Sequence, residues 1–98
     1  MTNKKYILDG KTLVEADLMT WATWLEKTVG RRVAYDKVGD KTISTVFIGI
    51  DHNFGEGEPH LFETMIFPES EVYERYPTWE SAEAGHKKCL EELKDLTK

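Results

Sequence analysis

The strongest constraint on this chain is a pair of apolar runs, residues 42–50 and 61–67, that flank one acidic loop containing glycine. Both runs are rich in β-branched and aromatic residues, which favour a pleated, half-buried surface. Within the first run, residues 46–48 are apolar without alternation, so this part should be covered on both faces or lie centrally in the sheet. The pattern predicts a long β-hairpin that the rest of the chain covers or extends.

The N-terminal part of the sequence predicts a second hairpin followed by a helix. Residues 6–14 form two short extended pieces around Asp9-Gly10, a pair that favours tight hairpin turns. Asp17 is a suitable N-cap residue, and Gly30 is a suitable stop. Between them, apolar residues recur at helical spacing: Leu18, Trp21, Ala22, Leu25 and Val29. Met19 and Trp24 fall off that stripe.

The remaining segments complete the expected fold. Alternation predicts a half-exposed strand over 31–38, residues 72–77 are expected to form an extended or turn connection, and Thr78 can cap a final helix. The apolar face of that helix is expected to contain Trp79, Ala82, His86, Cys89, Leu90, Leu93 and Leu96 or Thr97. We therefore expect one α+β domain spanning 1–98, with an antiparallel sheet of about three to five strands and two helices packed on one face.

Composition narrows the function classes. The chain has 98 residues, a formal net charge of −5 and a pI near 5.2. Direct nucleic-acid binding is not expected, because phosphate contacts need clustered Lys and Arg. No apolar run approaches the roughly 20 residues that span a bilayer, and no export signal is evident, so a cytoplasmic location without membrane insertion is expected. The single cysteine, Cys89, excludes an intrachain disulfide and is expected to be a small packing residue.

The loop over residues 51–60 concentrates the polar residues that could form a site. Side chains of the loop and of two later positions could bind a divalent metal or act as a general acid and base. These candidates are Asp51, His52, His60, Glu63 and His86. The loop does not match the spacing of an EF-hand, a phosphate-binding loop or a zinc-protease helix. No cofactor is expected, and no residue has the context of an activated nucleophile.

Three interpretations of the loop remain open: a solvated connection, a protein contact, and a metal or small-ligand site. Its length favours a functional surface over a tight turn. The residues expected to bind a partner are Asp51, His52, Asn53, Phe54, Glu56, Glu58, Trp24 and Tyr73. Trp24 is either a core residue, the favoured interpretation, or an exposed contact. His86 is more consistent with a core-edge histidine, and Glu63 is expected at the sheet's mouth or buried with Arg31, Arg32 or Arg75.

Three segments resemble a group of small proteins of tailed bacteriophages and prophages. They are S-T-V-F-I-G-I-D-H-N-F over 44–54, L-F-E-T-M-I-F over 61–67 and Y-P-T-W-E-S-A-E-A-G-H over 76–86, and the opening I-L-D-G-K fits the same group. The resemblance implies a bacterial cytoplasm during infection or lysogeny. It supplies no catalytic residue to carry over. Small acidic phage proteins of this kind are often accessory factors without enzymatic activity, and some block host defence or regulatory machinery.

The combined expectation is a phage-derived protein that binds, and inhibits, a host bacterial protein such as a defence or nucleic-acid-binding factor, without catalysis. One alternative is a small-ligand or divalent-metal binding protein, with hydrolysis as its activity, that uses the loop from Asp51 to Glu63. Another is a homo-oligomeric structural protein, with a homodimer as its simplest form.

Overall fold

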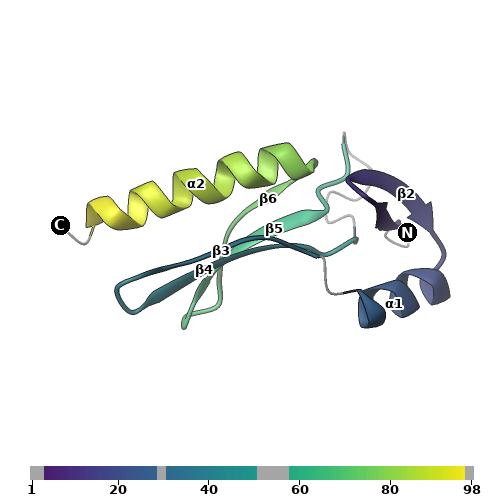
Figure 1. The fold of residues 1–98 in the computed structure, drawn as a ribbon, viewed down its shortest axis with the longest axis horizontal. Coiled ribbons are helices and arrows are strands. Elements are labelled where there is room, and N and C mark those ends of the chain that lie inside the picture. The colour runs from purple at the N-terminus through teal and green to yellow at the C-terminus, as the bar shows by residue number, and fades with distance from the viewer. Residues whose placement is uncertain (1–3, 29–30, 51–57, 97–98) are drawn as a thin grey trace.

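The computed structural model describes residues 4–28, 31–50 and 58–96. Within these ranges the chain forms two antiparallel sheets and two helices (Figure 1). The elements in chain order are β1 (Lys5–Asp9), β2 (Thr12–Ala16), α1 (Leu18–Lys27), β3 (Arg32–Val38), β4 (Lys41–Phe47), β5 (Phe62–Phe67), β6 (Glu71–Tyr76) and α2 (Trp79–Leu96). The predicted α+β class is confirmed.

The larger sheet is a four-stranded antiparallel meander in the order β3-β4-β5-β6. The predicted hairpin forms its centre, where β4 pairs with β5 from Thr42 opposite Phe67 to Phe47 opposite Phe62. Residues 72–77 were expected as an extended or turn connection, whereas Glu71–Tyr76 form the edge strand β6. A shift in register between β5 and β6 breaks the alternation there. Tyr73 and Tyr76 both pack against core clusters although they are three positions apart in the sequence. The sequence of this strand therefore lacks the period-two alternation by which strands are recognised.

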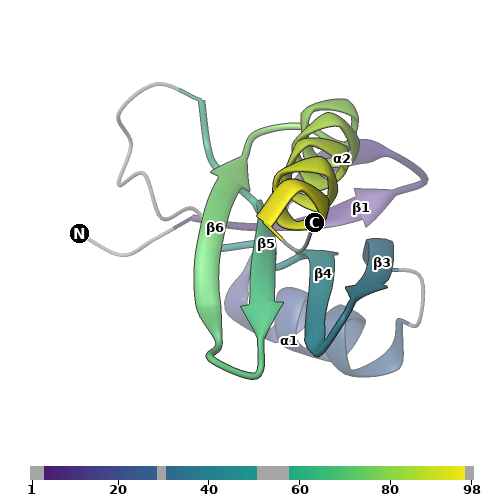
Figure 2. The same cartoon turned by 90° about the vertical axis from the view of Figure 1, so that its left-hand side faces the viewer.

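Helix α2 covers one face of this sheet and contacts all four of its strands (Figure 2). The Thr78 hydroxyl accepts a hydrogen bond from the Ser81 amide at 3.0 Å, so the predicted cap is confirmed. The buried side chains of α2 are Ala82, His86 and Cys89, all on the predicted apolar face. Leu96 was expected on that face but is 80% exposed. The last turn of α2 extends past the β3–β4 end of the sheet, where no strand covers it (Figure 1).

Helix α1 begins as predicted, with the Asp17 carboxylate accepting a hydrogen bond from the Thr20 amide at 2.7 Å. It ends at Lys27, and the predicted stop at Gly30 lies outside the described residues. The expectation that both helices share one face is wrong for α1. This helix packs chiefly against β1, at one end of the sheet and on the side away from α2 (Figures 1 and 2). The β1–β2 hairpin determines this position, because α1 follows β2 directly in the chain and packs against β1.

The junction between the hairpin and the large sheet is at Gly49. The Tyr6 amide donates a hydrogen bond to the Gly49 carbonyl at 2.7 Å, and Lys5 forms a bridge with Ile50. Gly49 has a φ of +73°, and the Tyr6 carbonyl and the Trp21 indole crowd the position that a Cβ would take. Only glycine meets both demands without strain. The core is continuous across this junction, since Leu8 of β1 packs in one cluster with Phe47, Leu61 and Phe62.

Candidate functional site

Most of the predicted loop site falls outside the described residues. This applies to the partner-binding and metal candidates Asp51, His52, Asn53, Phe54 and Glu56. Two loop positions are described: Glu58 is exposed and His60 is half-buried. The role of the loop as a contact surface therefore stays a prediction.

His86 is held inside the fold by hydrogen bonds at both ring nitrogens. Its Nδ1 lies 2.7 Å from the Thr45 hydroxyl, and its Nε2 lies 2.8 Å from an Asp36 carboxylate oxygen. The Thr45 hydroxyl is also hydrogen-bonded to that of Thr64. This chain of contacts, called here the His86 network, joins β3, β4 and β5 to α2. The interpretation of His86 as a histidine bonded to a hydroxyl at the edge of the core is confirmed.

The order Asp36, His86, Thr45 resembles the acid, base and nucleophile of a covalent hydrolase. A nucleophile must be able to reach a substrate, whereas the Thr45 side chain has no exposed surface. It lies between the sheet and α2, and its hydroxyl also bonds Thr64. The His86 network therefore satisfies polar groups within the core and does not present a reactive hydroxyl.

Glu63 lies on the other face of the sheet from the His86 network, because it neighbours Thr64 along β5. Its carboxylate accepts a hydrogen bond from Arg75 Nε at 3.0 Å across the β5–β6 pair. Arg75 is thus the partner among the three arginines considered. Across the described ranges, no three His, Cys, Asp or Glu side chains are grouped closely enough to hold a metal ion. Glu63 and His86, two of the candidate ligands, do not converge.

Trp24 and Tyr73, the two partner-binding candidates outside the loop, both have contacts within the fold. The Trp24 ring meets Phe47 edge to face, with ring centroids 5.5 Å apart, in agreement with the favoured core interpretation. The Tyr73 hydroxyl donates a hydrogen bond to Glu92 at 2.9 Å. Burial, and then this carboxylate, raise the pKa of Tyr73. Trp24 is only half-buried, so part of its surface remains available.

Cys89 has no exposed surface, which confirms its predicted packing role. Burial, followed by the nearby Glu92 carboxylate, raises the pKa of its thiol to about 11. We expect a thiol-specific reagent to label the unfolded chain rapidly and the folded protein hardly at all near pH 9, because only the thiolate reacts. The folded state keeps its proton where the unfolded state loses it, so stability should also fall as the pH rises from about 9 to about 11. Rapid labelling of the folded protein would contradict this assignment.

An apolar hollow of about 500 Å³, called here the α1–β1 groove, lies between α1 and β1. Its lining includes Ile7, Met19, Trp24, Lys27 and Thr28. Met19 is 73% exposed, and Leu18 beside it in sequence is 58% exposed. Both residues belong to a helix with no fully buried side chain. Large apolar side chains thus remain uncovered next to this shallow hollow, a combination typical of interaction surfaces.

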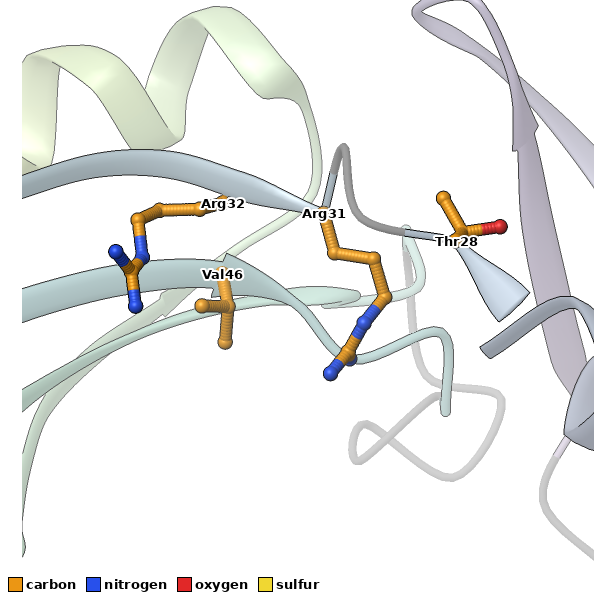
Figure 3. Close-up of a pocket in the computed structure, with 4 residues that line it drawn as sticks. All are labelled: Thr28, Arg31, Arg32 and Val46. Carbon is orange, nitrogen blue, oxygen red and sulfur yellow. The ribbon is translucent and has the colours of Figure 1, made fainter. Parts of the chain in front are cut away.

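A second hollow of about 420 Å³, called here the arginine pocket, adjoins the groove and is lined by Thr28, Arg31, Arg32 and Val46 (Figure 3). Arg31 donates a hydrogen bond from Nη1 to the Phe47 carbonyl at 3.1 Å. The Arg32 guanidinium lies 4.5 Å from the centre of the Tyr35 ring. Thr28 lines both hollows, so they adjoin at this residue.

Sequence reasoning did not find these two hollows. Arg31 and Arg32 are the only adjacent arginines in the sequence. Their place just after a helix C-terminus, where cations are favoured, is compatible with a structural role as well as with ligand recognition. Met19 lies off the apolar stripe of the first predicted helix, and this position was the feature of the sequence that indicated an exposed apolar contact. The hollows themselves depend on how the end of α1 meets β1, β3 and β4, and no local pattern encodes that arrangement.

Comparison of the chain with protein-family models, curated proteins and solved structures finds no match. The resemblance to phage proteins therefore stays a prediction from the quoted segments. Neither described helix has the length and apolar character needed to cross a membrane.

Proposed function

We propose that this chain is a phage accessory protein that binds and inhibits a host bacterial protein, without catalysis of its own, through the α1–β1 groove. The resemblance of three segments to phage proteins supports the setting. The observation that carries the proposal is the exposure of Met19 at a groove that also contains Trp24, with Leu18 exposed next to Met19 in the sequence. A defence or nucleic-acid-binding factor is the class of host protein we expect.

The physical argument rests on the cost of leaving such side chains in water. Burying one large apolar side chain contributes about 1.5–3 kcal/mol. The fold leaves Met19 and Leu18 without more than half of that burial. Methionine adapts to irregular partner surfaces because it is unbranched and flexible. Trp24 provides a rigid aromatic wall, half-buried against Phe47, of the kind that dominates binding energy at interfaces.

Met19→Glu is expected to abolish capture of the host partner from bacterial lysate while leaving the unfolding midpoint nearly unchanged. The reason is that a carboxylate would have to be buried at the contact, whereas in the free protein it would lie in water. The matched control is Leu96→Glu, which places the same charge on a comparably exposed apolar residue outside the groove. Captured protein is quantified by mass spectrometry against wild type.

Equal loss of capture in both variants, or in neither, would contradict the groove as the contact surface. A third variant tests whether the loop contributes to the same contact, and it replaces Phe54, Glu56 and Glu58 together. Capture that survives this change while Met19→Glu abolishes it would assign the contact to the groove alone. Capture lost in the triple variant only would assign it to the loop.

A further inference from the structure

We propose that the host partner inserts a single carboxylate side chain, from Asp or Glu, into the arginine pocket beside the α1–β1 groove. This inference rests on the proposed function and adds the chemistry of the partner. It assigns a ligand class to Arg31 and Arg32, whose role in the fold does not require two adjacent guanidinium groups.

Within the described residues, neither Arg31 nor Arg32 forms an ion pair with an acidic side chain. Lys4, Lys41 and Arg75 each pair with a glutamate. Within the described residues, the contacts of Arg31 and Arg32 are instead with a carbonyl oxygen and an aromatic ring. A carbonyl or a ring orients a guanidinium and leaves its positive charge uncompensated. The pocket therefore holds two positive charges in a chain whose formal net charge is −5.

Each arginine is held in place by a contact of its own. The bond to Phe47 holds Arg31 in place, and the Tyr35 ring supports Arg32, so little side-chain freedom is lost on binding. A guanidinium offers parallel N–H donors that match the two oxygens of a carboxylate. In Figure 3 both arginine side chains leave the start of β3 and flank Val46, which forms an apolar wall between them.

The negative balance of the chain, a formal net charge of −5, opposes a phosphate dianion more strongly than a carboxylate monoanion. Helix α1 ends next to the pocket at Lys27, whose ammonium offsets the partial negative charge of the helix C-terminus, so the helix end does not discriminate between these anions. A nucleic-acid backbone is also disfavoured, because the rest of this acidic chain would repel it. Since Thr28 lines both hollows, the expected partner segment carries an acidic residue close to an apolar one.

The test is an NMR titration of the ¹⁵N-labelled full chain with sodium acetate, at neutral pH and with ionic strength held constant by sodium chloride. Acetate reproduces the end of an Asp or Glu side chain. We expect saturable shifts of the Arg31 and Arg32 Nε–Hε signals in the millimolar range. Arg32→Gln should weaken acetate binding about tenfold through loss of a charge-assisted hydrogen bond. Lys37→Gln, which removes the same charge from an exposed site on β3, should leave binding unchanged.

Inorganic phosphate is titrated in parallel, and Arg31→Lys is included because it keeps the charge while removing the fork that bonds Phe47. Two results together support the proposal. Acetate binding should weaken in both Arg32→Gln and Arg31→Lys, and the wild-type protein should bind acetate at least as tightly as phosphate. Tighter binding of phosphate would overturn it in favour of a free phosphate ligand. No saturable shift with either anion would also overturn it. The capture experiment with Met19→Glu does not depend on this outcome, so failure of the pocket and failure of the groove are distinguishable.

Discussion

Gly49→Ala is expected to detach the β1–β2 hairpin and α1 from the large sheet. A Cβ at this position would lie 2.5 Å from both the Tyr6 carbonyl oxygen and Trp21 Nε1. The first contact is backbone and belongs to the strand that docks on Gly49 through a 2.7 Å hydrogen bond. Backbone strain at positive φ costs about 1–2 kcal/mol, and overpacking adds about 1–3 kcal/mol. The free energy of unfolding should fall by about 2–5 kcal/mol, measured by urea denaturation.

Gly10→Ala separates the two causes. Gly10 has a similar φ of +64°, but a Cβ there would meet nothing within 4 Å. This control should show only the loss from backbone strain. Hydrogen exchange gives a second readout, because Gly49→Ala should speed exchange in β1 and α1 more than in β4 and β5. Equal losses in Gly49→Ala and Gly10→Ala would show that contact with Tyr6 and Trp21 does not restrict this position.

Gly85→Ala is the second substitution with a large expected effect. Gly85 lies in α2 directly over Tyr76, and a Cβ would approach the ring carbon Cε1 to 2.1 Å and the hydroxyl oxygen to 2.4 Å. Helix propensity alone would make alanine more stable by about 1 kcal/mol. Because Tyr76 is buried in the main core cluster and cannot move aside freely, we expect a net destabilisation of about 1–3 kcal/mol. The sign of the change in thermal midpoint therefore decides between propensity and packing.

A double-mutant cycle with Tyr76→Leu provides the control. The smaller side chain removes the ring that the new Cβ would strike, so Gly85→Ala should become neutral or stabilising in that background. The same penalty in both backgrounds would mean that the contact between α2 and Tyr76 is not its source.

Local patterns predicted most of the elements, because each depends on residues near in sequence. The Asp17 and Thr78 caps, the Asp9-Gly10 turn and the apolar runs around the loop all indicate their elements directly. The position of α1 could not be predicted in this way, since it depends on a hydrogen bond between Tyr6 and Gly49. Strand β6 was missed because its shifted register breaks the alternation that identifies strands.

The candidate site was predictable only in part, for a similar reason. His86 and Glu63 could be recognised from the sequence as residues that need hydrogen-bond or ion-pair partners if buried. Arg75 was one of three arginines considered as the partner of Glu63. Their actual partners lie on other strands. Arg75 of β6 bonds Glu63, whereas Asp36 of β3 and Thr45 of β4 bond His86 on the opposite side of the sheet. The arginine pocket draws its walls from the end of α1 and from β3 and β4, so its existence depends on tertiary packing.

The His86 network also bears on how this protein can evolve. Thr45 is hydrogen-bonded to both His86 and Thr64, so replacing it alone would leave two buried polar groups without that bond, at a cost of about 1–3 kcal/mol each. Replacing the same residues together with apolar ones of similar shape can be nearly neutral. Related sequences should consequently keep Thr45, Thr64 and His86 as a set or exchange them as a set, and this covariation would identify distant relatives.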